Sequence, residues 1–165
     1  MTRLVVSDTS VLSALAEIEL IEGLLSCFGT VTITQAVFDE CSHERAPLAL
    51  REWIANPPDW LNVVGDPVDY LPVTRTLGDG EASSITLAWS WRSECLLLLD
   101  ERRGRRVADG LGLQMTSTLA LIAQAGARGE VDFDEALIRL NATGFRLLDS
   151  VIAEARKMAE SHNGN

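Results

Sequence analysis

The stretch LVVSDTS, residues 4–10, decides the fold class of this chain. It opens with three apolar residues, which is the pattern of a short buried strand. Good helix N-caps follow at once, and apolar residues at helical spacing begin at Val11. We therefore predict a buried strand that leads directly into a helix, the opening unit of an α/β fold.

The same alternation of apolar runs and amphipathic segments continues along the chain. It predicts further strands at residues 30–33, 60–64, 95–99 and 113–116, and a loop at 66–76. It predicts helices at 11–18, 21–28, 48–55, 107–111, 118–125, 133–142 and 150–159. It also predicts a helix that follows the cap Thr34 and a helix that begins at Gly78. Apolar strands covered by helices on both sides indicate a parallel sheet, so the predicted architecture is a three-layer α/β/α sandwich.

The domain organisation follows from length and from the pattern at the C-terminal end. A chain of 165 residues fits one domain, and we predict a single domain over residues 1–165. Two amphipathic helices at about 132–160 are expected to pack on this domain or to extend it. The tail Ser161–Asn165 is polar and glycine-containing, and we expect it to fray.

Composition excludes several classes of protein. Hydrophobic residues make up 47% of the chain and charged residues 23%, which is ordinary for a globular protein. No apolar run reaches the roughly 20 residues that span a bilayer, and the N-terminus lacks the apolar segment of a secretory signal. Cys27, Cys41 and Cys95 are odd in number and widely spaced, which argues against a disulfide framework or a zinc site. We expect a cytoplasmic protein with reduced cysteines and no membrane partner.

The charge balance bears on a nucleic-acid partner in two ways. The formal net charge of −10 disfavours RNA or DNA binding, because neutralisation of phosphates by basic residues provides most of its affinity. The positive charge is concentrated, however, in an arginine cluster formed by Arg102, Arg103, Arg105 and Arg106. Arginine binds two phosphate oxygens at once, so this cluster is a candidate phosphate contact, or simply a solvated face.

Four acidic residues are expected to meet at one edge of the predicted sheet. Asp8 and Asp100 each follow a strand, Glu81 starts the helix that leads into the fourth strand, and Glu40 lies about two turns into the helix after Thr34. Carboxyl ends of parallel strands gather at one edge, where ligands bind. Clustered carboxylates repel one another unless a cation lies among them, and carboxylate oxygens suit Mg²⁺ or Mn²⁺. Local structure alone would make Asp8 a helix cap, Glu81 a first-turn acid and Glu40 an exposed helix residue.

Four segments of the chain together resemble a known family. They are, in this order, VVSDTSVLSALAEI, ITQAVFDEC, LGDGEASSITLA and LLLLDERRGRRVADGLGLQMTSTLALI. Together with the spacing between them, they cover roughly residues 4–126. In sequence and spacing they resemble the PIN-domain ribonucleases, particularly the VapC-type toxins of toxin–antitoxin pairs and a mostly uncharacterised bacterial and archaeal subgroup. The resemblance makes the last segment a strand with the fourth acid, an arginine-rich turn and a final strand and helix.

The resemblance implies a function and a set of site residues. It implies a Mg²⁺- or Mn²⁺-dependent endoribonuclease that hydrolyses RNA, forms a homodimer and pairs with an antitoxin. The implied catalytic and metal-binding acids are Asp8, Glu40, Glu81 and Asp100. Auxiliary positions are Thr9, Ser10, Glu101 and Thr118, and the arginine cluster would contact RNA phosphates.

Two departures and several alternatives stay open. Many toxin-like members have aspartate at the position of Glu81, and Glu101 is a neighbour that could replace Asp100. A catalytically silent PIN-fold module for binding or dimerisation fits the acidic net charge. A haloacid dehalogenase-like phosphatase is disfavoured because Ser10 stands where its second aspartate belongs. A dinucleotide-binding fold is disfavoured because no GxGxxG follows the first strand.

Overall fold

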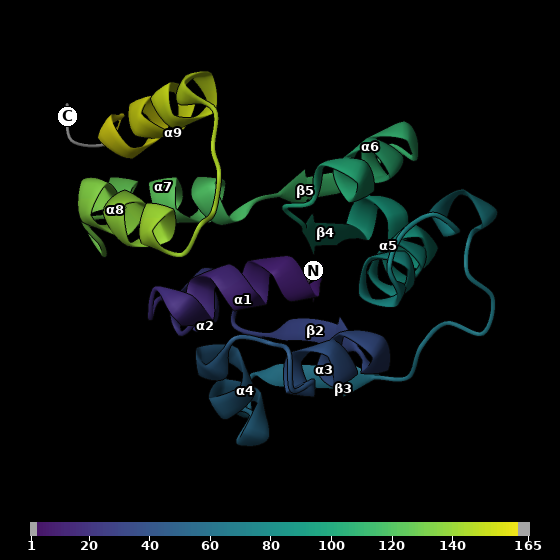
Figure 1. Cartoon of the computed structure of the whole chain (residues 1–165). Helices are drawn as coiled ribbons and strands as arrows, with labels where there is room; N and C mark the ends of the chain where they lie inside the picture. Colours follow the sequence, from purple (N-terminus) through teal and green to yellow (C-terminus); the bar gives the residue numbers. More distant parts are fainter. Residues whose placement is uncertain (1–2, 162–165) are drawn as a thin grey trace. The chain divides into compact units, whose positions relative to one another are not determined.

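The computed structural model describes residues 3–161 and divides the chain into two compact units, residues 1–116 and 117–165. Figure 1 shows both units and labels most of their helices and strands. Of the tail Ser161–Asn165, which we expect to fray, residues 162–165 lie outside the described residues. The four-acid site predicted from the sequence falls entirely within the first unit.

The first unit is built on a parallel sheet. Within the described residues its strands are β1 Leu4–Ser7, β2 Val31–Thr34, β3 Leu61–Val64, β4 Cys95–Leu98 and β5 Gln114–Thr116. They are ordered β3-β2-β1-β4-β5, and every pair is parallel. Ser7 of β1 is in register with Leu98 of β4, so these two strands end side by side. The predicted parallel sheet is confirmed.

Helices cover both sides of this sheet. They are α1 Thr9–Glu17, α2 Gly23–Phe28, α3 Gln35–Ser42, α4 Leu48–Ala55, α5 Asp79–Trp91 and α6 Arg102–Gly110, with short 3-10 turns η1 Pro72–Thr74 and η2 Arg92–Glu94. Ile85 of α5 and Ala108 of α6 pack with Val6 and Leu97 of the strands in one buried cluster. Helices α1, α3 and α4 pack on one another, and the right-handed crossovers usual between parallel strands put them on the other face of the sheet. The three-layer α/β/α architecture is therefore confirmed.

Local sequence explains where α3 begins and why α6 begins earlier than expected. Thr34 is extended, and its side chain accepts a hydrogen bond from the Val37 N–H at 3.2 Å, which caps α3. The predicted helix at 107–111 starts at Arg102 instead, so the expected arginine-rich turn is wrong and these arginines are helical. Arginine is a good helix former, and the apolar stripe from which the helix was predicted starts only at Val107.

The second unit contains the helices α7 Thr118–Ala127, α8 Phe133–Ala142 and α9 Asp149–Glu160. The two C-terminal helices predicted at about 132–160 are α8 and α9, and both pack against α7 within this unit. Asp132 caps α8 by accepting a hydrogen bond from the Glu135 N–H at 2.9 Å. The assignment of the whole chain to one domain stays a prediction. Among the described residues, no helix has the length and apolar character needed to cross a membrane.

Candidate active site

The carboxyl edge of β1 and β4 is the point where the strand order reverses. The chain passes outward from β1 to β2 and β3, then returns to place β4 on the other side of β1. Such a switch point opens a crevice in which α/β proteins bind ligands. Asp8 follows β1 there, and its N–H donates to the Leu98 carbonyl at 3.1 Å. Asp100 lies two residues beyond the end of β4.

Asp8 is both a helix cap and a buried acid. Its side chain accepts from the Val11 N–H at 3.3 Å at the start of α1, as expected of an N-cap. The residue is only 1% exposed. Burial raises the pKa of its carboxyl well above the ordinary value, and the negative charges of Asp100 and Glu81 raise it further. Hydrogen bonds from Ser10 and Val11 oppose this rise without cancelling it. The residue that caps α1 is therefore also one of the acids of the candidate site.

Ser10 connects the two strand-end aspartates. Its hydroxyl lies 2.8 Å from each carboxylate oxygen of Asp8 and donates to them. The same oxygen accepts from the Asp100 N–H at 3.4 Å. Because one hydroxyl contacts both residues, Ser10 holds the ends of β1 and β4 in a common arrangement. The structure thus brings the predicted auxiliary residue Ser10 to the acids.

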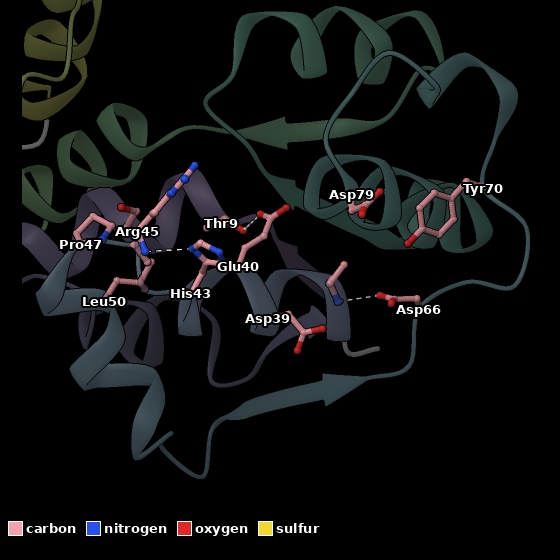
Figure 2. A pocket seen from close by; sticks show the side chains of 13 residues that line it. Thr9, Asp39, Glu40, His43, Arg45, Pro47, Leu50, Asp66, Tyr70 and Asp79 are labelled. Carbon is pink, nitrogen blue, oxygen red and sulfur yellow. Dashed lines mark hydrogen bonds between the residues drawn. The ribbon is translucent and has the colours of Figure 1, made fainter.

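Glu40 is held by both of its carboxylate oxygens. The Thr9 hydroxyl donates to Oε2 at 2.5 Å, and the Gly80 N–H donates to Oε1 at 2.9 Å. Figure 2 shows Thr9 and Glu40 facing each other, joined by a dashed line. Glu40 on α3 therefore connects the first turn of α1 with the first turn of α5, and it is not the freely exposed residue that local sequence allowed.

The carboxylate of Glu81, unlike that of Glu40, has an oxygen that accepts no hydrogen bond from the part of the chain that the structure describes. Its Oε2 is buried and has no hydrogen-bond partner among the described residues. This oxygen lies against Gly104 of α6, in the space that a Cβ would occupy. Burial raises the pKa of Glu81, the charges of Glu101 and Glu40 raise it further, and Arg103 lowers it. A buried acceptor without a donor is costly, which makes this oxygen a candidate ligand for a cation.

The chemistry of these residues fits a divalent cation. Asp8 is buried, the charges of Asp100 and Glu81 oppose its ionisation, and Glu81 carries an unpartnered oxygen. Oxygen ligands of this kind are those that Mg²⁺ and Mn²⁺ prefer, and a bound cation would reverse the repulsion. Within residues 3–161, no three His, Cys, Asp or Glu side chains are grouped closely enough to hold an ion as they stand.

The remaining predicted residues have differing surroundings. Glu101 is the exposed N-cap residue of α6. In the arginine cluster, Arg102, Arg103 and Arg106 are exposed, whereas Arg105 is partly buried. Its Nη1 donates to the Leu99 carbonyl at 2.6 Å and to the Thr116 carbonyl at 3.4 Å, which ties the ends of β4 and β5 together. Thr118 is fully buried in α7, within the second unit.

Sequence reasoning missed two features beside the acids. A cavity of about 530 Å³ adjoins Glu40 and is also lined by Asp39, Asp66, Tyr70 and Asp79 (Figure 2). The loop that supplies Asp66 and Tyr70 shows no periodic pattern, so no local signal pointed to it. The contact between Gly80 and Glu40 was also missed, although a glycine directly before a candidate acid was a visible signal.

Fold and site together define a class: an α/β domain whose switch point carries buried carboxylates suited to a divalent cation. The model of the family DUF3368, described as a PIN domain, matches residues 4–161, and the chain belongs to this family of PIN domains. No curated protein and no solved structure matches the chain significantly. PIN domains are typically nucleases that act on RNA and generally use divalent metals such as Mg²⁺. The resemblance to the PIN-domain family is thus confirmed.

Proposed function

We propose that this PIN domain is a Mg²⁺- or Mn²⁺-dependent endoribonuclease in which Asp8, Glu40, Glu81 and Asp100 are the catalytic and metal-binding acids. One observation carries the proposal: the unpartnered, buried Oε2 of Glu81 near an almost fully buried Asp8. The negative charges of Glu81 and Asp100 oppose the ionisation of Asp8. Repulsion among these negative charges destabilises the folded protein unless a cation offsets them.

The roles of the residues follow from their contacts. Asp8, Glu40, Glu81 and Asp100 would hold the ion, which when bound supplies positive charge for the phosphoryl oxygens and acidifies a water molecule. Ser10 orients the Asp8 carboxylate, and Thr9 orients that of Glu40. The exposed arginines of the cluster neutralise neighbouring RNA phosphates. In hydrolysis, a water oxygen bonds to phosphorus while the bond from phosphorus to one ribose oxygen breaks.

We further propose that the protein is a cytoplasmic, homodimeric toxin of the VapC type, inhibited by an antitoxin encoded beside it. Membership in the PIN-domain family supports this proposal. Expression of the chain alone is expected to arrest growth, and co-expression of the neighbouring gene is expected to restore it. Growth without arrest on expression of active enzyme would instead indicate a nuclease that is not a toxin.

The test of the enzymatic proposal is cleavage of defined RNAs by the purified protein. We expect cleavage of single-stranded or structured RNA with Mg²⁺ or Mn²⁺, and none with a chelator. Asp8→Asn should lower the rate by about 100-fold or more, because it removes an anionic ligand from the site. A protein that is inert on all RNAs with either metal would contradict the proposal.

A second candidate is a catalytically silent PIN module for binding or dimerisation. The net charge of −10 favours it, because such a charge repels RNA at long range. A silent module would form stable dimers or bind a protein partner, and neither property would change in Asp8→Asn. Metal-dependent cleavage by the wild-type protein would exclude this candidate.

A further inference from the structure

Gly80 occupies a position at which the backbone does not require glycine. It is buried in the first turn of α5 and does not belong to the described residues with positive φ, so alanine could adopt its conformation. Glycine also destabilises a helix relative to alanine. The reason for glycine here must therefore lie in the space beside it.

That space is filled by the carboxylate of Glu40. A Cβ built on Gly80 would have three Glu40 atoms as its nearest neighbours, with Cδ at 2.7 Å and Oε1 at 2.8 Å. Real Cβ atoms do not approach other atoms so closely, so the carboxylate of Glu40 would have to shift from its present position. The Gly80 N–H meanwhile donates to Oε1 at 2.9 Å. Gly80 thus provides both the room and one of the two donors for Glu40.

The position of Gly80 in the chain gives this contact a wider consequence. The next residue is Glu81, whose unpartnered oxygen faces Gly104. Glu40 comes from α3 and Glu81 from α5, and the bond from Gly80 to Glu40 joins the first turn of α5 to α3.

We propose that Gly80 is a positioning residue, which seats the Glu40 carboxylate and so sets the relative placement of Glu40 and Glu81. The proposal rests on the proposed metal-dependent function, since its purpose is to arrange oxygen ligands for a cation. Substitution should disturb the site more than the fold, because the displaced group is the end of a flexible side chain.

The first test is Mn²⁺ affinity, measured by isothermal titration calorimetry. Gly80→Ala should weaken binding by about tenfold or more, as is usual when a supporting contact of a metal ligand is lost. The matched control is Gly23→Ala, which alters a first-turn helix glycine with open space around it and should leave binding unchanged. Equal affinity of Gly80→Ala and the wild-type protein would overturn the proposal.

The second test separates positioning from a general loss of structure. In a Glu40→Ala variant the space beside Gly80 no longer holds a carboxylate. The further change Gly80→Ala should therefore alter Mn²⁺ affinity by less than about twofold. A general structural defect would weaken binding by the same factor in both backgrounds, which would also overturn the proposal.

A third measurement does not depend on metal binding. The Gly80 amide, observed by NMR in metal-free protein, should move upfield and lose protection from hydrogen exchange in Glu40→Ala. An unchanged amide would show that Gly80 does not hold Glu40. If the wild-type protein binds neither Mn²⁺ nor Mg²⁺, the proposed function fails, whereas the Gly80 amide still shows whether Gly80 holds the Glu40 carboxylate.

Discussion

At the scale of single residues, Asp8 shows how one side chain serves both folding and the proposed chemistry. It caps α1 and is almost fully buried, and it lies where β1 ends beside β4. Capping stabilises the helix, whereas burial near other carboxylates opposes ionisation. Ionisation of Asp8 therefore destabilises the folded protein when no metal is bound, and a bound cation would offset this loss.

This balance predicts the pH dependence of stability. The pKa of Asp8 is raised in the folded state above the ordinary value of 3.8, so the folded protein holds this proton more tightly than the unfolded chain. The free energy of unfolding of metal-free protein should therefore fall as the pH rises above the ordinary value of 3.8 and through the raised pKa of the folded state. Asp8→Asn should flatten this fall, as measured by urea denaturation with a chelator present. An identical slope in the variant would contradict the assignment.

The arginine cluster gives a second prediction at this scale, because its members differ in the hydrogen bonds that they make and in their exposure. Arg105 donates to two backbone carbonyls at the ends of β4 and β5, whereas Arg106 is exposed. Arg105→Ala should lower the free energy of unfolding by about 1–3 kcal/mol, since the carbonyls lose their donor. Arg106→Ala should change it by less than about 0.5 kcal/mol. Urea denaturation of the two variants decides, and equal losses would show that Arg105 has no such structural role.

At the scale of elements, the start of α3 determines where Glu40 lies. Thr34 ends β2, caps α3 and shares a hydrogen bond of 2.8 Å with the Ser83 hydroxyl of α5. One residue thus links a strand with two helices, both of which carry a proposed ligand.

Removal of this cap gives a prediction for the element. Thr34→Ala should lower the free energy of unfolding by about 1–2 kcal/mol, because the first turn of α3 loses its side-chain acceptor. Thermal or urea denaturation measures the loss. The control Thr30→Ala alters an exposed threonine just before β2 and should stay within about 0.5 kcal/mol of the wild-type protein. Equal stability of the two variants would contradict the role of Thr34.

At the scale of the whole molecule, metal binding and folding are coupled. A ligand that binds only the folded state stabilises that state by about 2.7 kcal/mol when its free concentration is 100 times its Kd. For a protein of this length such a gain corresponds to a rise of about 5–10 °C in Tm. We expect Mn²⁺ to raise the Tm of the wild-type protein accordingly, and not that of Asp8→Asn. Scanning calorimetry or a dye-based melt measures this shift in Tm. A shift of equal size in both proteins would show that Mn²⁺ does not bind at Asp8.

Several features of this protein were determined by its sequence alone. Short apolar runs and helical stripes are local patterns, so the strands of the sheet and helices such as α8 at Phe133–Ala142 appeared where they were predicted. Asp8 and Asp100 were placed at one edge by a topological rule, because parallel strands end together. The start of α6 was missed because its first turns contain arginines, which carry no apolar period.

Only the tertiary structure decided how the acids are held. Glu40 accepts hydrogen bonds from Thr9, 31 residues before it, and from Gly80, 40 residues after it. No local pattern encodes contacts across such separations, because they exist only once the helices have packed on the sheet. The unpartnered oxygen of Glu81 and the use of Arg105 as a backbone tie arise in the same way. Sequence patterns thus place Asp8 and Asp100 after strands and Glu81 at a helix start, and packing determines which oxygens remain available to a cation.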